Sequence, residues 1–108
     1  MEKTIIYSPE VKIYFIELID VLFEKEYFGF SESAEEYVNK IREFIEQKIG
    51  FYPSKNTPLE LLKFGEMYIR YESNSNTSWY IFYSQVEQTY FIKLISNNHS
   101  EYLAGLNL

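Results

Sequence analysis

The chain has a single histidine, His99, among its 108 residues. Imidazole, with an unperturbed pKa of about 6.5, is the only side chain here whose ordinary pKa suits proton exchange near neutral pH. Two cations, Arg70 and Lys93, lie inside segments of β-forming residues and could hold an anion. A histidine and two cations on one surface would suit acid–base chemistry on a phosphate, provided that the fold brings them together.

The composition excludes most other chemistry. The chain has no cysteine, which rules out disulfides, thiolate zinc sites and a cysteine nucleophile. One histidine cannot form a multi-histidine metal site. The four glycines form neither a dinucleotide-binding motif nor a phosphate-binding loop. We therefore expect no metal and no cofactor.

The length predicts one domain over residues 1–108, and 46% hydrophobic residues are enough for a core. No apolar run approaches the length of a membrane span or of a signal-peptide core. We expect a soluble, cytoplasmic protein with no membrane partner. The net charge of −6 argues against non-specific binding to nucleic acid, which needs clustered lysine and arginine.

Two helices are predicted after a short strand at residues 3–7. Ser8 and Pro9 supply an N-cap and a proline at the first helical position, so a helix should run from about 9 to 27. Its apolar stripe is wide enough to need burial against both a sheet and another helix.

The second helix is predicted at about 32–48. Ser33 and Glu36 have the spacing of a capping box, and Gly50 supplies the stop. One face is apolar and includes Ile41 and Phe44, while the opposite face is charged.

Residues 51–63 are predicted to form a loop with one helical turn at 59–62. Three strands joined by short polar turns follow, at residues 66–72, 79–84 and 89–96, and a short helix is expected at 101–106. The predicted fold is α+β in the order β-α-α-β-β-β(-α). It is an antiparallel sheet of about four strands with the two helices packed as a hairpin on one face.

Alternation along the strands predicts which side chains face the helices. Ile69, Ile81, Ile92 and Leu94 should point toward them. The opposite face would then be uncovered and would gather the remaining strand residues, namely Tyr68, Arg70, Tyr80, Phe82, Phe91, Lys93, Ile95 and, at its end, His99.

This order of elements resembles toxins of the RelE/ParE superfamily, the toxin half of type II toxin–antitoxin pairs. The resemblance covers nearly the whole chain and is sharpest over residues 64–102, in Phe64-Gly65, in the central-strand run 79–83 and in the last-strand run 92–99.

Family members commonly end the last strand in a basic residue and then carry a tyrosine. His99 and Tyr102 stand at those positions here, and Tyr80 stands where the central strand customarily has a basic residue.

The resemblance implies a bacterial toxin that inhibits growth and binds a cognate antitoxin, which would cover the aromatic sheet face or wrap the helices. Some members cut mRNA on the ribosome without metal, by attack of the 2′-hydroxyl on the adjacent phosphate. For that reaction it implies His99, Tyr80 and Tyr102 as catalytic residues and Arg70 and Lys93 as phosphate ligands. Other members bind DNA gyrase and have no nuclease activity.

Simpler roles are open to the same residues. His99 could cap a turn, Arg70 could pair with Glu66 or Glu72, and Lys93 could be an exposed solubilising charge. The acidic balance favours the alternatives to RNA cleavage, which are a gyrase-binding toxin or a family member retained as a protein-interaction module.

Overall fold

The computed structural model describes residues 2–24, 33–101, 103, 105, 106 and 108. The expected end of the first helix at 25–27, the connection after it and Tyr102 lie outside the described residues. The elements are β1 (Thr4–Tyr7), α1 (Pro9–Glu24), α2 (Ala34–Lys48), β2 (Lys55–Asn56), the 3-10 helix η1 (Leu59–Phe64), β3 (Met67–Glu72), β4 (Ser78–Val86) and β5 (Thr89–Asn97).

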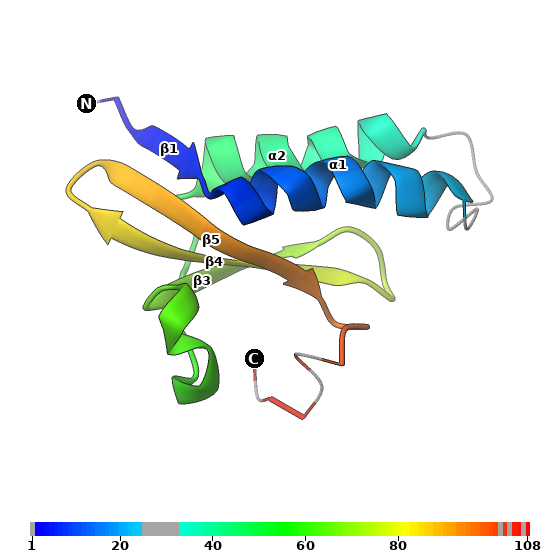
Figure 1. Cartoon of the computed structure of the whole chain (residues 1–108). Helices are drawn as coiled ribbons and strands as arrows, with labels where there is room; N and C mark the ends of the chain where they lie inside the picture. Colours follow the sequence, from blue (N-terminus) through cyan, green and yellow to red (C-terminus); the bar gives the residue numbers. More distant parts are fainter. Residues whose placement is uncertain (1, 25–32, 102, 104, 107) are drawn as a thin grey trace.

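The molecule is layered (Figure 1). α1 and α2 lie side by side on one face of a five-stranded sheet with strand order β1-β5-β4-β3-β2. η1 and the C-terminal segment lie on the other face. In the described part of the chain, no helix combines the length and hydrophobicity that crossing a membrane requires.

Both helix starts follow the predicted capping chemistry. The Ser8 hydroxyl accepts a hydrogen bond from the Val11 amide at 3.2 Å, and the Ser33 hydroxyl accepts one from the Glu36 amide at 3.1 Å. Gly50 follows α2 with a φ of +88°, a backbone conformation that glycine adopts with less strain than other residues. A Cβ there would also collide with the Tyr90 hydroxyl. The predicted N-caps at Ser8 and Ser33 and the stop at Gly50 are confirmed.

The prediction of an antiparallel sheet of about four strands is wrong in two respects. β1 pairs with β5 in parallel, and β2, inside the predicted 51–63 loop, adds a fifth strand antiparallel to β3. Tight turns fix direction only between consecutive strands, whereas β1 and β5 come from opposite ends of the chain and meet through tertiary packing. The sheet is therefore mixed.

The short helix expected at 101–106 is not formed by the described residues. They make isolated turns instead, with the Leu103 amide bonded to the Ser100 carbonyl and the Leu106 amide to the Leu103 carbonyl. The helical turn expected at 59–62 is present as η1.

A β-bulge changes the faces of β5. Phe82 pairs with Leu94 but Tyr83 pairs with Ile92, so Lys93 has no partner across β4. One extra residue shifts the alternation of every later side chain. The predictions for Leu94 and Ile95 are therefore wrong, because Ile95 lies in the helix-side core and Leu94 packs on the opposite face.

The helix-side core joins both helices to one sheet face. Ile41, Ile45, Ile81 and Ile92 are all fully buried there. A hydrogen bond of 2.9 Å from Trp79 Nε1 to the Tyr37 hydroxyl also links β4 to α2 inside this core. Both helices therefore cover the same face, as predicted.

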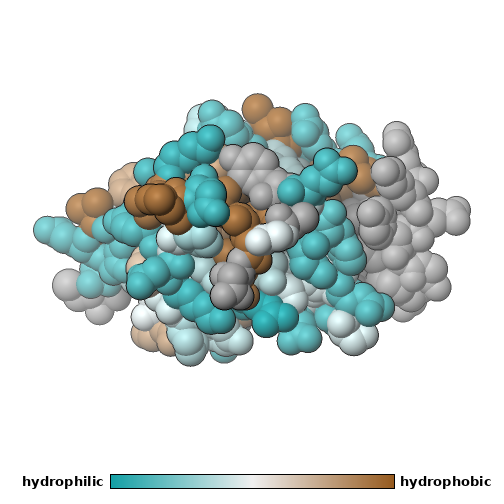
Figure 2. Space-filling view, turned by 90° about the horizontal axis from the view of Figure 1, so that it is seen from below, coloured by the Kyte–Doolittle hydropathy of each residue, from teal (hydrophilic) through white to brown (hydrophobic). Residues whose placement is uncertain are grey.

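The opposite sheet face is not uncovered, which corrects the prediction for its aromatic residues. η1 and the C-terminal segment contribute side chains to a second core, whose buried members are Leu61, Tyr68, Tyr80, Phe82 and Leu103. Viewed from this side, the described surface is mostly hydrophilic, with hydrophobic residues in small groups (Figure 2). The chain itself therefore buries much of the aromatic surface.

We expect Ile41→Ala to lower the free energy of unfolding by about 2–5 kcal/mol, because it opens a cavity in a core that excludes water. Urea denaturation followed by circular dichroism measures this change. Ile16→Ala, at a side chain 66% exposed on α1, is the matched control and should cost less than about 1 kcal/mol. An equal loss of unfolding free energy in the two variants would contradict the assignment of Ile41 to the buried face of α2.

Candidate functional site

Arg70 and Tyr80 lie in one row across the sheet. Arg70 on β3 is the register partner of Tyr80 on β4, which is opposite Ser96 on β5. The Arg70 side chain is exposed, and its Nη2 donates to the Ser78 hydroxyl at 3.0 Å. This bond, rather than a predicted pairing with Glu66 or Glu72, holds the guanidinium at the start of β4.

Hydrogen bonds join this row to the turn that carries His99. The Ser78 amide donates to Asn98 Oδ1 at 2.9 Å, and the Asn98 Nδ2 donates to the Asn76 carbonyl at 3.1 Å. The β3–β4 turn and the end of β5 therefore form one connected structure next to Arg70.

His99 is exposed at this corner. Its Nε2 shares a hydrogen bond of 3.1 Å with the Thr77 hydroxyl, and its amide donates to Asn97 Oδ1 at 2.9 Å. The second bond is the Asx-turn geometry expected of a turn residue. His99 thus has a structural role and an accessible ring.

Tyr80 is only 7% exposed and belongs to the second core. It lines a cavity of about 230 Å³ together with Asn98 and four residues of the C-terminal segment, which are Leu103, Gly105, Leu106 and Leu108. Access to Tyr80 is therefore through this cavity and not from an open sheet face.

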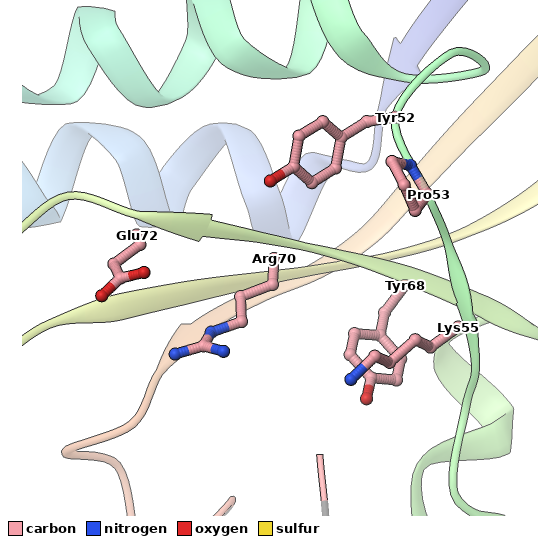
Figure 3. Close-up of a pocket in the computed structure, with 6 residues that line it drawn as sticks. All are labelled: Tyr52, Pro53, Lys55, Tyr68, Arg70 and Glu72. Atoms are coloured by element: carbon pink, nitrogen blue, oxygen red, sulfur yellow. The ribbon is translucent and has the colours of Figure 1, made fainter.

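A second cavity, of about 240 Å³, lies at the β2–β3 edge and is lined by Tyr52, Pro53, Lys55, Tyr68, Arg70 and Glu72 (Figure 3). Lys55 is the register partner of Tyr68, so both cations of this cavity lie on the same side of β3. Two cations beside a tyrosine can hold an anion, although the Glu72 carboxylate offsets one of the charges. The sequence interpretation missed Lys55, because a two-residue strand has no periodic signal, and Tyr52, which lies in the irregular segment before that strand.

Burial raises the pKa of Tyr68, the neighbouring Tyr80 raises it further, and Arg70 lowers it. The phenol therefore keeps its proton at neutral pH and cannot act as a base there.

Lys93 lies away from this corner. It is exposed at the bulge, separated from the end of β5 by about 13 Å of strand. Its charge helps to lower the pKa of the Glu66 carboxyl. The main cause of that lowered pKa is a 2.8 Å hydrogen bond from the Ser84 hydroxyl. The structure thus brings Arg70, Tyr80 and His99 together and leaves Lys93 apart, while Tyr102 lies outside the described residues.

Among the residues that the structure describes, no three histidine, aspartate or glutamate side chains group closely enough to hold a metal ion. None of the protein-family models, curated proteins or solved structures compared with the chain matches it.

We expect Ser84→Ala to raise the pKa of Glu66 toward its ordinary value, because the variant removes the largest cause of the lowered pKa. Lys93→Ala should raise it less, since the lysine charge is the smallest cause. A lowered folded-state pKa stabilises the fold above the unfolded pKa and loses that effect as the pH falls through the folded pKa. NMR titration of the Glu66 side-chain carboxyl carbon measures both shifts, and a larger shift for Lys93→Ala would contradict this ordering.

Proposed function

We propose that the chain is a toxin of the RelE/ParE type, paired with a cognate antitoxin, that inhibits translation by cutting ribosome-bound mRNA without a metal. The observation that carries the proposal is the connected corner where Arg70 and His99 are both exposed and joined through Ser78 and Asn98. The order of β1, α1, α2, β3, β4 and β5, on which the resemblance rests, also supports it.

In the proposed reaction, the ribose 2′-oxygen attacks the adjacent phosphorus and the bond from phosphorus to the 5′-oxygen breaks. A base takes the 2′-hydroxyl proton, and an acid protonates the departing 5′-oxygen. The products are a cyclic phosphate and a 5′-hydroxyl, so atoms balance without an added reactant. Arg70 would bind the phosphate oxygens as negative charge grows on them.

His99 would transfer one of these protons through Nδ1, because its Nε2 is held by the Thr77 hydroxyl. That hydrogen bond holds the ring to the β3–β4 turn, in which Thr77 lies. Tyr80, reached through its cavity, and Tyr102 are the proposed partners for the other proton. Lys93 would bind a neighbouring phosphate and not the scissile one, since the strand separates it from the corner.

A second candidate function is a toxin that binds DNA gyrase, or a related interaction module, without cutting RNA. The net charge of −6 favours it, because affinity for RNA is largely electrostatic. Exposed isoleucines on α1, Ile13 at 54% and Ile16 at 66%, favour a protein partner as well.

We expect His99→Ala to lower RNA cleavage by about 10²–10⁴-fold, the usual contribution of one general acid or base. Cleavage is measured on translated mRNA with purified ribosomes by mapping new 5′ ends. His99→Gln keeps a hydrogen-bonding side chain and should be as inactive. Thermal unfolding of both variants separates a catalytic defect from a disrupted turn.

Arg70→Ala and Lys93→Ala should instead weaken RNA binding. They should also make the affinity less dependent on salt: the slope of log affinity against log salt concentration should fall by about one unit for each phosphate that the variant no longer binds. Stable His99 variants that still arrest growth would contradict the nuclease proposal. Gyrase-dependent DNA damage in the same cells, without new mRNA ends, would then favour the second candidate.

A further inference from the structure

α1 carries two stripes of side chains at helical spacing. The first, Val11, Phe15 and Leu18, is buried in the helix-side core at 2%, 2% and 7% exposure. The second runs along the opposite, solvent side and includes Ile13 and Ile16, which are 54% and 66% exposed. Within the described chain, α2 lies along one side of α1 and the sheet beneath it, and the solvent side is open (Figure 1).

The second stripe has the spacing of a coiled-coil seam. Pro9, Ile13, Ile16 and Asp20 follow one another at intervals of four, three and four residues along α1. At such a seam, side chains one position away form the flanks and contact the flanks of a packed helix. Glu10 and Glu17 lie on one flank of this seam and Lys12 on the other.

The charges on this stripe select its partner. A second copy packed antiparallel would bring Glu10 toward Glu17 of the copy, and a parallel copy would place Asp20 against Asp20 within the seam. Both arrangements bring like charges together. A parallel copy would also pair Lys12 with Glu17 on the flanks, but the two Asp20 carboxylates within the seam would be the less solvated and more costly contact. The helices α1 and α2 together carry eight acidic and four basic side chains, so the surroundings add to the negative field.

We propose that this stripe of α1 is the docking surface for one amphipathic helix of a partner protein. The partner helix presents an apolar seam to Ile13 and Ile16, with lysine or arginine facing Glu10, Glu17 and Asp20. α1 covers one face of the sheet, and Arg70 lies on the other face beside Tyr68 and Tyr80. Only the identity of the partner as the antitoxin rests on the proposed function, whereas the chemistry of the partner helix does not.

The test uses two synthetic helical peptides of three heptads, labelled for fluorescence anisotropy and titrated with the full chain. Both carry isoleucine and leucine at the seam, and they differ only in having lysine or glutamate on the flanks. The lysine peptide should bind at least about tenfold more tightly than the glutamate peptide. The difference should shrink at about 1 M salt, which screens exposed charges within about 3 Å.

Ile16→Ser should weaken binding of the lysine peptide by about tenfold, because it removes apolar contact from the centre of the seam. Glu17→Lys should weaken it too and should improve binding of the glutamate peptide. Leu59→Ser is the matched control, since Leu59 is 83% exposed on η1 and lies outside the seam. Circular dichroism confirms that each variant keeps its helices.

Equal affinity of the two peptides, or unchanged binding by Ile16→Ser, would overturn the proposal. A dimer of the chain that Ile16→Ser dissociates, seen by sedimentation, would also overturn it in favour of a second copy. The readouts separate this surface from the proposed reaction. His99→Ala should bind the lysine peptide normally, and a chain that binds the peptide but cuts no RNA would overturn only the nuclease.

Discussion

The structure depends on a central strand that is buried on both faces. Residues 78–83 of β4 are all buried, and successive side chains enter the two cores in turn. A strand in that position cannot slip by one residue, because every side chain would move into the wrong core. β4 therefore fixes the register of both neighbours, and with it the placement of Arg70 beside Tyr80 and of Asn98 beside Ser78.

Local signals in the sequence are enough to predict the helices, their caps and the two hairpins. The Ser33 hydroxyl caps α2 through the Glu36 amide, and Gly50 follows the end of the same helix. Both signals involve residues close together in the chain, so a short stretch of sequence is enough to identify them. The parallel pairing of β1 with β5 and the pairing of Lys55 with Tyr68 are different. Their energies come from packing between distant segments, and neither a four-residue nor a two-residue strand has a distinctive period.

The candidate site could be predicted wherever the side chains of a strand alternate regularly between the two faces of the sheet. Arg70 and Tyr80 precede any irregularity in their strands, and they share a face as predicted. Beyond Lys93 the bulge shifts the alternation, and nothing in an apolar strand with one lysine distinguishes a bulge from a solvent-facing charge. The cover over Tyr80 was missed because Leu103 and Leu106 reach it from isolated turns, which have no periodic signal either.

The layered arrangement also bears on the chain's acidic charge. The net charge of −6 is spread unevenly, because α1 and α2 account for −4 of it. The helices pack on the sheet face opposite Lys55 and Arg70 (Figure 3), and charges separated by more than about 10 Å are largely screened at 0.1 M salt. The same imbalance makes the helix layer attractive to a basic segment. Residues 64–108, which form most of the far sheet face, carry two basic and four acidic side chains, so the binding of an anion there would depend on the local placement of Arg70 and Lys55 and not on the net charge of that face.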